Sequence, residues 1–360
     1  SNPGVCGLYN LGNTCYMNST LQCLLHNFEL MKHMQHSCYI IDFNPQITLH
    51  SDENGISTGI AHYFSKLLKK YWSGEFSVVV PDEFKQQLAK IHSQFDGNGQ
   101  HDGQELLALF LESLHQERKT MIKSNVSSTE ETTNGHNTDT TADKLWDKYI
   151  DDNQSAIVDI FQGQLESTVI CSKCEFKSVT YEPFMYLSLP LNSVDETSPG
   201  EQTLTLEMCL SAYTKSEILD DENPWYCPTC CCHQVAEKQL RICRWPDTLI
   251  VYIKRFLYHS KNAVKVDDEV LFPMESFNPG AISGTRPNRF KSYNLVACMS
   301  HFGGVYSGHY TAHCKHPVTG KWYLYNDENV SEQELSSKDN AGAYVLFYQH
   351  NAARNSSLYS

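Results

Sequence analysis

The sequence predicts an α+β fold, with helices in the first third of its 360 residues and an antiparallel sheet in most of the remainder. Two patterns lead to this prediction. Apolar residues recur at helical spacing as far as residue 115, and they alternate with polar residues from residue 155 onward. In addition, two Cys-x-x-Cys motifs in the strand-rich part indicate a small extension held together by a metal ion.

Four helices are expected in the first part of the chain. The opening turn, GLYNLGNTC, leads into a stripe of Leu21, Leu24, Leu25 and Phe28 at helical spacing. Together the four helices predict a helical lobe that ends at residue 123. The other three show the same periodicity and cover residues 59–71, a segment that begins near Pro81, and HDGQELLALFLESLH at residues 101–115.

Residues 124–142, SNVSSTEETTNGHNTDTTA, interrupt this pattern with Ser, Thr and Asn residues and almost no apolar side chains. Such a segment cannot bury enough surface to offset the entropy that is lost on ordering it. We therefore expect a disordered polar insertion between the helical lobe and the strands. A solvated loop would have the same consequence for the fold.

Alternating segments rich in β-branched and aromatic residues follow the insertion and predict strands. TLIVYIKRF at residues 248–256 is a continuous apolar run of the kind found in a buried strand. No repeat of 20–50 residues is evident, which argues against a solenoid or propeller. The other expected strands lie within residues 164–191, 292–304, 308–316, 321–327 and 343–350.

Composition and charge narrow the function. The formal net charge is −14, which argues against nucleic-acid binding because phosphate contacts need clustered Lys and Arg residues. An acidic surface does permit a partner with a basic face. No apolar run reaches the roughly 20 residues of a membrane span, and the first ten residues lack the pattern of a secretory signal. We therefore expect no membrane association.

The 14 cysteines favour a reducing compartment, because we expect no export signal on this chain. The protein is accordingly expected in the cytoplasm, the nucleus or both, and as a monomer. In that environment a cysteine serves as a metal ligand, a nucleophile or a small buried side chain. The role of each cysteine has to be inferred from its spacing and its surroundings.

The motifs CSKC and CPTC predict a zinc site. Each Cys-x-x-Cys turn can direct two thiolates at one ion, and two such turns complete the tetrahedral set that Zn²⁺ prefers. A catalytic zinc usually keeps a water beside His or carboxylate ligands, so we expect a structural ion. Packing or redox-active thiols are the alternative, and either Cys231 or Cys232 could replace the last ligand. The expected ligands are Cys171, Cys174, Cys227 and Cys230.

Cys15 stands apart because it has no Cys-x-x-Cys partner and lies where a glycine-containing turn leads into the first helix. The unpaired N–H groups and the dipole at a helix N-terminus lower the pKa of a thiol and favour the nucleophilic thiolate. Gly12 permits the turn, and Asn13 or Thr14 could cap the helix. From local sequence alone, a buried packing residue is the simpler interpretation of Cys15.

A nucleophilic cysteine needs a base, and the segment GGVYSGHYTAH supplies His309 on an alternating strand. Asn326 and Asp327 follow in YLYNDENV, at the end of the next expected strand. A hairpin of this size would bring that strand end beside His309. Either Asn326 or Asp327 could then accept the imidazole N–H and fix its tautomer.

These segments resemble the ubiquitin-specific proteases, a family of papain-like cysteine deubiquitinases. GLYNLGNTCYMNSTLQCLL is similar to the family's Cys box, and GHYTA followed by WYLYND is similar to its His box. HDGQELLALFLESLH and LIVYIKRF match two further family segments. The paired Cys-x-x-Cys motifs fall where the family carries its zinc-finger extension. The motifs occur in family order from residue 7 to residue 348, which is nearly the whole chain.

The resemblance implies the architecture of a papain-like cysteine protease that surrounds a bound ubiquitin. A helical thumb, a palm built on an antiparallel sheet, and zinc-bearing fingers make up this architecture. On this chain it implies a thumb at residues 1–123, the polar insertion at 124–142, mainly fingers at 143–255, mainly palm at 256–350 and a tail at 351–360.

The resemblance also implies catalytic roles. Cys15 would be the nucleophile, His309 the general base and Asn326 the third residue of the triad. Asp327 would share the orienting or electrostatic work. Asn10 matches the family's oxyanion-hole amide, and the backbone N–H of Cys15 would be its companion donor. For Asn10 the alternative is a turn residue that bonds its own backbone.

Five further residues are expected to contact ubiquitin, whose C-terminal tail is basic and ends in two glycines. Two of them are acidic, and their alternative role is to stabilise a helix N-terminus. The other three are aromatic, and their alternative role is packing within the protein. The five residues are Asp102, Glu105, Tyr306, Tyr310 and Phe161.

The implied activity is a thiol-dependent deubiquitinase that hydrolyses the isopeptide or peptide bond after the C-terminal glycine of ubiquitin through a thioester. Its partners would be ubiquitin and ubiquitinated proteins. Two other classes stay open. A ubiquitin-binding scaffold with weak or no activity is one, and the presence of Cys15, His309 and Asn326 argues against it. A Cys–His acyl transferase for small molecules is the other, and the paired zinc motifs argue against that.

Overall fold

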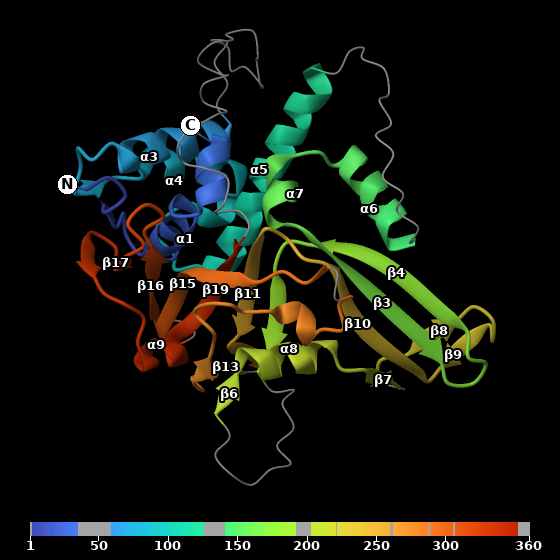
Figure 1. Ribbon diagram of the computed structural model, residues 1–360. Helices are drawn as coiled ribbons and strands as arrows, with labels where there is room; N and C mark the ends of the chain where they lie inside the picture. The colour runs from blue at the N-terminus through green and yellow to red at the C-terminus, as the bar shows by residue number, and fades with distance from the viewer. Residues whose placement is uncertain are drawn as a thin grey trace.

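Figure 1 shows the computed structural model, in which a helical part packs on a seven-stranded sheet and a smaller sheet projects away from both. The combination of helices with a mainly antiparallel sheet confirms the predicted α+β fold class. The structure describes residues 2–34, 59–125, 141–191, 203–220, 222–259, 262–286, 289–304 and 307–351.

The first part of the chain folds into helices at the four predicted positions. Helix α3 illustrates the reason, because its apolar residues Ile60, Phe64 and Leu67 are buried on the face that meets the neighbouring helices. Helix α5 extends well beyond the segment predicted for it. The elements are α1 (Cys15–Leu25), α3 (Ile60–Trp72), α4 (Asp82–Ile91), the short 3₁₀ helix η1 (Ser93–Phe95) and α5 (Gly103–Asn125).

Two further helices lie where the sequence predicts none. Helix α6 (Thr141–Asp152) begins inside the expected polar insertion, and α5 runs to Asn125, so both ends of that insertion are helical. The rest of it, residues 126–140, lies outside the described residues. Helix α7 (Ala156–Phe161) replaces an expected strand, because its run AIVDIF is too short for periodicity to separate helix from strand. The hydroxyl of Ser155 caps it by accepting a backbone hydrogen bond.

The seven-stranded sheet, called the palm sheet below, has the strand order β18-β17-β16-β15-β19-β11-β5. Neighbouring strands are antiparallel except at one edge, where β11 pairs in parallel with β5. The strands predicted between residues 292 and 350 are all present. The bounds are β5 (Leu187–Pro190), β11 (Thr248–Lys254), β15 (Tyr293–Gly303), β16 (Gly308–Lys315), β17 (Trp322–Asn326), β18 (Asn329–Glu332) and β19 (Ala343–His350).

A hydrophobic core covers each face of the palm sheet. On one face, Ile250 and Phe347 pack with the buried apolar residues of α1, α3, α5 and α7. On the other face, Val251 and Leu346 pack with α8 (Leu206–Thr214), a helix that the sequence does not predict. Successive residues of a strand point to opposite faces, which is why adjacent residues serve different cores. The strands that carry the candidate catalytic residues are therefore held from both sides.

A second, four-stranded sheet projects from the palm sheet and is called the fingers sheet below (Figure 1). Its strands are antiparallel in the order β4-β3-β10-β7, and the β8–β9 hairpin lies at its far end. The described residues of that hairpin belong to neither hydrophobic core. The bounds are β3 (Gly163–Cys171), β4 (Lys177–Phe184), β7 (Glu217–Leu219), β8 (Trp225–Cys227), β9 (Cys232–Gln234) and β10 (Ala236–Arg244).

Short elements complete the described part of the chain. Strand β1 pairs with β2 and β6 with β14, both in parallel, whereas β12 and β13 form an antiparallel hairpin. None of the described helices combines the length and the apolar character that crossing a lipid bilayer requires. The bounds are β1 (Gly7–Leu8), β2 (Val78–Val79), β6 (Leu204–Thr205), β12 (Phe256–His259), β13 (Asn262–Lys265), β14 (Val270–Leu271), η2 (Pro279–Ala281) and α9 (Ser337–Gly342).

Candidate active site and metal centre

Cys15 is the first residue of α1, as the sequence predicts, and its side chain is almost completely buried. The turn before it contains two left-handed residues, Gly12 (φ 104°) and Asn13 (φ 54°), which explains the glycine in the motif. Contrary to expectation, no side-chain hydrogen bond from Thr14 or Asn13 caps the helix. Instead, the side-chain oxygen of Asn10 accepts hydrogen bonds from the backbone N–H groups of Gly12 and Thr14, at 2.9 and 3.2 Å.

His309 on β16 lies close enough to Cys15 for its imidazole to interact with the thiol. This contact is the main reason why the pKa of His309 is raised to about 9, and a hydrogen bond with Asn326 adds to the rise. Nε2 of His309 lies 2.7 Å from Oδ1 of Asn326, the last residue of β17. Because an amide oxygen can only accept, Nε2 carries a proton, and the other ring nitrogen is left for the thiol.

Asn326 and Asp327, which the sequence could not rank, have different partners. Asn326 contacts the imidazole, whereas Asp327 adopts a left-handed backbone conformation (φ 50°) that gives its side chain other partners. Its carboxylate accepts one hydrogen bond from the amide of Asn10 at 2.9 Å and another from the amide of Asn18 at 2.7 Å. Asp327 therefore fixes the Asn10 amide, and its charge reaches His309 only over a longer distance.

A cleft of about 440 Å³ opens beside Cys15. Its lining comes from the start of α1, the segment before α5, the start of β12, the end of β15 and the start of β16, which are far apart in the sequence. Packing of the helical part on the palm sheet thus creates the cleft. The lining residues that matter for the argument are Cys15, Gln100, Asp102, Phe256, His301 and Tyr310.

The two acidic candidates for substrate contact occupy different surroundings. Asp102 lines the cleft and caps α5, because its Oδ1 accepts a hydrogen bond from Gln104 N at 2.7 Å. Its Oδ2 accepts a hydrogen bond from Tyr344 at 2.6 Å, and burial raises the pKa of this carboxyl group. Glu105 is exposed, is not among the residues that line the cleft, and bonds Gln94 at 3.0 Å. The helix-stabilising alternative is thus present at Asp102, and a contact with substrate stays a prediction.

The three aromatic candidates also differ. Tyr310 both lines the cleft and packs against the rings of His301 and Tyr344, so its two expected roles are compatible. Phe161 is completely buried in the core between the helices and the palm sheet. The expectation that Phe161 contacts ubiquitin is therefore wrong, because α7 turns this ring inward. Tyr306 lies outside the described residues.

Sequence reasoning missed two residues that line the cleft, His301 and Phe256. The His301 ring lies 4.6 Å from the Tyr310 ring and 5.3 Å from the Phe256 ring. Burial lowers the pKa of His301 to about 4, so this ring is neutral near pH 7. A Cβ at Gly308 would come within 1.9 Å of the His301 ring, which explains the glycine next to His309. The pairing of His301 with Tyr310 across neighbouring strands could have identified His301 as a cleft residue. Recognising this pairing requires knowledge of the strand register.

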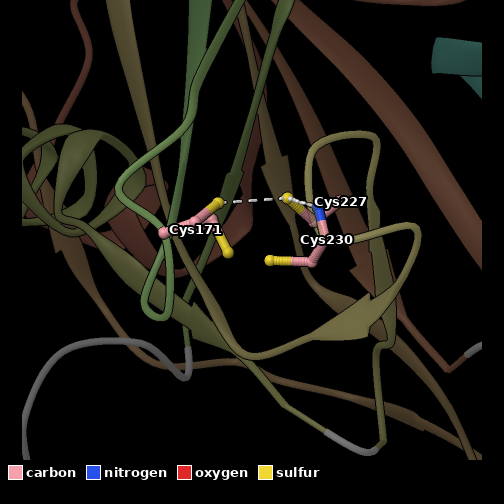
Figure 2. A group of neighbouring side chains, drawn as sticks. Cys171, Cys227 and Cys230 are labelled. Atoms are coloured by element: carbon pink, nitrogen blue, oxygen red, sulfur yellow. Dashed lines mark hydrogen bonds between the residues drawn. The ribbon is translucent and has the colours of Figure 1, made fainter.

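The four predicted zinc ligands come together at the far end of the fingers sheet. Their Sγ atoms all lie within 4.8 Å of one another. Figure 2 shows the thiols of Cys171, Cys227 and Cys230 directed toward a common point. The fourth thiol, of Cys174, lies 3.5 Å from that of Cys227. Two turns that are about fifty residues apart thus form one cluster.

The donor set fits a tetrahedral zinc ion. Zn–S bonds of about 2.3 Å place sulfur atoms about 3.8 Å apart in a tetrahedron, and the observed spacing is close to this. The backbone N–H of Cys230 approaches the Cys227 sulfur at 3.4 Å. The backbone N–H of Cys174 is the main reason why the pKa of Cys171 is lowered. Such N–H···S contacts favour the thiolate form that a metal requires.

The structure also decides which of three consecutive cysteines joins the cluster. Cys230 does, whereas Cys231 adopts a left-handed conformation (φ 55°) and places its thiol 3.4 Å from the carbonyl oxygen of Pro228. Cys232 is exposed and accepts a hydrogen bond from Gln234 at 3.0 Å. The turn after Cys230 thus directs the two following thiols away from the cluster.

Comparison with known proteins identifies relatives over nearly the whole chain. The family model described as ubiquitin carboxyl-terminal hydrolase matches residues 6–348. Ubiquitin carboxyl-terminal hydrolase 2 from Bos taurus is 35% identical over 350 residues, which cover 97% of this chain and 55% of the bovine protein. The protein of the same name from Gallus gallus is 32% identical over 348 residues, which cover 96% and 93%. The chain spans about half the length of the mammalian relatives it matches.

Solved structures are similar in fold. The SAGA Ubp8/Sgf11/Sus1/Sgf73 DUB module bound to ubiquitin aldehyde matches with a TM-score of 0.73 and 25% identity, over 97% of this chain and 70% of that chain. A structure of this module bound to monoubiquitin matches with a TM-score of 0.70 and 26% identity, with the same coverage. Both matches extend over nearly all of the chain, so the similarity applies to the whole fold and not to one part of it.

Proposed function

Because the chain belongs to the ubiquitin carboxyl-terminal hydrolase family, we propose that it is a thiol-dependent deubiquitinase. Its resemblance to the ubiquitin-specific proteases is confirmed by the same matches. The proposed reaction is hydrolysis of the isopeptide or peptide bond after the C-terminal glycine of ubiquitin. Two similar structures, which hold ubiquitin aldehyde and monoubiquitin, support ubiquitin as the substrate.

One observation carries the proposal, namely the hydrogen bond between His309 and Asn326 together with the interaction of His309 with the Cys15 thiol. These residues come from α1, β16 and β17, and no local sequence feature would bring them together by chance. The Asn326 amide holds the imidazole, and the imidazole meets the thiol. This is the order of contacts that a nucleophile, a base and an orienting residue require.

The proposed acylation step uses these contacts directly. The raised pKa of His309 places the proton of the Cys15 thiol on the imidazole, and the resulting thiolate attacks the carbonyl carbon of the last glycine of ubiquitin. The carbon–nitrogen bond then breaks, and His309 gives its proton to the departing amine. Water, activated by the same imidazole, hydrolyses the thioester and releases ubiquitin.

Two donors support the negative charge that develops on the carbonyl oxygen. One is the backbone N–H of Cys15 at the start of α1, and the other is the side-chain amide of Asn10. The Asn10 amide has two N–H groups, and the bond to Asp327 uses one of them. The second is available for the oxyanion. Asp327 is thus proposed as the residue that fixes this donor, and Asn326 as the third member of the triad.

The cleft beside Cys15 is proposed to hold the ubiquitin tail. Tyr310 and Phe256 narrow it with their rings, and the neutral His301 ring packs between them. A narrow channel of this kind selects glycine, because a larger side chain would meet these rings. Asp102 places a carboxylate on the same cleft and is the proposed contact for a basic residue of the tail.

The cysteine cluster is proposed to hold a structural zinc ion through Cys171, Cys174, Cys227 and Cys230. The ion would supply a cross-link among strands that bury little apolar surface. We further propose that the protein acts as a monomer on ubiquitinated proteins, without nucleic acid or membrane as partners, and that it works in the cytoplasm, the nucleus or both.

A ubiquitin that carries a C-terminal thiol-reactive group tests the proposal. We expect one covalent adduct, which peptide mapping locates at Cys15. The Cys15→Ala variant should bind ubiquitin without forming the adduct. Cys232→Ser is the matched control, because it removes an exposed thiol outside the cluster and should leave the adduct unchanged.

A ubiquitin C-terminal fluorogenic amide separates the function classes. A deubiquitinase releases the dye, whereas a scaffold binds ubiquitin without turnover. A small-molecule acyl transferase would neither bind nor cleave it. Labelling of a cysteine other than Cys15 would contradict the site assignment, and binding without any adduct would favour the scaffold.

A further inference from the structure

A second cavity, of about 310 Å³, lies at the base of the fingers sheet. The start of α6, strands β3, β4 and β10, and the segment around Thr285 enclose it. It shares no lining residue with the cleft beside Cys15. The lining residues that the argument uses are Thr141, Glu166, Arg241, Arg286 and Arg289.

This cavity is cationic in a chain whose net charge is −14. Arg241, Arg286 and Arg289 line it, and Glu166 is the carboxylate among the described lining residues. Glu166 is paired with Arg241 at 2.6 Å. Arg286 is exposed, and its side chain makes no hydrogen bond or ion pair with another described residue. Its guanidinium group is therefore available to an anion.

A neighbouring carboxylate neutralises the remaining charge only in part. One oxygen of the buried Asp143 accepts hydrogen bonds from the guanidinium groups of both Arg244 and Arg289. Burial lowers the pKa of Arg244, and the positive charge of Arg289 lowers it further. Four arginines thus meet three carboxylates, Glu166, Asp143 and Asp147, at this place.

Hydrogen-bond donors at the cavity also lack acceptors. The Nε–H of Arg241 has no partner among the described residues, while another nitrogen of this guanidinium group pairs with Glu166. Thr141 begins the twelve-residue helix α6, whose first backbone N–H groups have no intrahelical partner. Its hydroxyl and the helix N-terminus add donors on the side opposite β10.

We propose that this cavity binds a phosphate group, either inorganic phosphate or the phosphate of a monoester. Guanidinium groups pair with phosphate through two parallel hydrogen bonds, and a phosphate anion offsets the surplus of positive charge. The cavity is larger than a single phosphate, so a monoester also has room for its organic part. A bound phosphate joins α6, β10 and the Arg286 segment, and so fastens the base of the fingers sheet.

Isothermal titration calorimetry with inorganic phosphate tests the proposal on the whole chain at low ionic strength. We expect saturable binding of one phosphate per chain. The Arg286→Gln variant should bind at least about tenfold more weakly, because it loses one charge-assisted contact. The fold should be unaffected, since Arg286 is exposed and its side chain makes no hydrogen bond or ion pair with another described residue.

Lys148→Gln is the matched control, because it removes one exposed charge from α6 without touching the cavity. It should keep the affinity of the unmodified chain. Phosphate should also raise the melting temperature of the unmodified chain and of Lys148→Gln, but not that of Arg286→Gln. The last comparison excludes a general salt effect on stability.

Phosphoserine distinguishes the two sources of phosphate. Binding tighter than that of inorganic phosphate supports a monoester as the ligand, and weaker binding supports the free anion. The proposal is overturned if neither compound binds saturably to the unmodified chain. It is also overturned if Arg286→Gln and Lys148→Gln bind phosphate equally well, because binding would then occur elsewhere.

Discussion

The catalytic cleft and the far end of the fingers sheet obtain their order from different sources. Around the cleft, Cys15 and Tyr310 belong to a large hydrophobic core, and the palm sheet has a second core on its other face. At the far end of the fingers sheet, Ile218 and Tyr226 are more than half exposed, and no residue of β8 or β9 belongs to either core. Four cysteines converge there instead.

This difference indicates that the proposed catalytic reaction and the proposed binding of ubiquitin by the fingers sheet depend on separate parts of the fold. Burial of apolar surface, at roughly 25 cal/mol per Å², holds the catalytic residues in place without any ligand. The fingers sheet buries little at its far end, where the proposed metal cross-link would replace the missing core. Changes to the catalytic triad proposed for the cleft should therefore alter kcat more than stability, and changes at the cysteine cluster should alter stability and substrate binding more than kcat.

Substitution of Asn326, which holds the imidazole, should have the largest effect on kcat. We expect Asn326→Ala to lower kcat by about 10²–10⁴-fold, because His309 loses the acceptor that fixes its tautomer. The melting temperature should change little. Asn329→Ala is the matched control, since Asn329 is exposed and lies opposite Asn326 on β18. A fully active Asn326→Ala enzyme would show that Asp327 performs this task.

Loss of the metal should affect substrate binding more than chemistry. Cys227→Ser should lose bound zinc and raise KM for a ubiquitin amide by about tenfold, which corresponds to 1.4 kcal/mol. Backbone amides of β8 and β9 should exchange faster with solvent, while iodoacetamide should label Cys15 at an unchanged rate. Cys232→Ser, which removes a thiol outside the cluster, should keep the zinc.

Elemental analysis provides the decisive check on this prediction. Pure protein without tightly bound zinc would contradict the structural role of the cluster. Equal zinc content in Cys227→Ser and Cys232→Ser would contradict the assignment of ligands. If alkylation of Cys15 slows in Cys227→Ser, the cysteine cluster and the cleft are coupled and do not behave as independent regions.

The pKa of His309 should report on the thiol contact. NMR titration of the unmodified chain should give a value of about 9, and Cys15→Ala should bring it down toward the ordinary 6.5. The sign for stability follows from the raised value in the folded state. The contribution of His309 is fully present below pH 6.5 and is lost as the pH rises through 9. The stability difference between the two proteins should shrink over this range.

This expectation has a clear contrary outcome. An identical His309 titration in both proteins would mean that the imidazole does not meet the thiol in solution. The proposed general base would then lack its proton donor. Urea unfolding of the two proteins at pH 6 and at pH 10 checks the stability part of the prediction independently.

Substitution of Asp102 should have the smallest effect on activity. Two variants separate its role as the cap of α5 from its proposed contact with the ubiquitin tail. Asp102→Ala removes the cap of α5 and should cost about 1 kcal/mol of unfolding free energy. Asp102→Asn keeps a capping side chain, so its stability should stay nearly unchanged. If the carboxylate binds a basic residue of the ubiquitin tail, Asp102→Asn alone should raise KM. An unchanged KM would leave Asp102 as a cap only.

Much of the fold and of the candidate site could be predicted from the sequence because the signals are local. The stripe of α3 and the alternation of β16 each depend on residues within one element. Helices α7 and α8 escaped prediction because such short apolar runs suit a helix and a strand equally well. The expected surface role of Phe161 failed for the same reason, since an unrecognised helix turned its ring into the core.

The sequence by itself determined the kinds of chemical group, namely a cysteine at a helix N-terminus, a histidine on a strand and two pairs of thiols that can bind a metal ion. Only the tertiary structure decided that Asn326 meets His309 while Asp327 holds Asn10, and that Cys230 rather than Cys231 joins the cluster. The physical reason is that side-chain direction depends on backbone dihedral angles and on strand register. At Asp327 and Cys231 the chain takes a left-handed turn, and residue types alone do not specify such a turn.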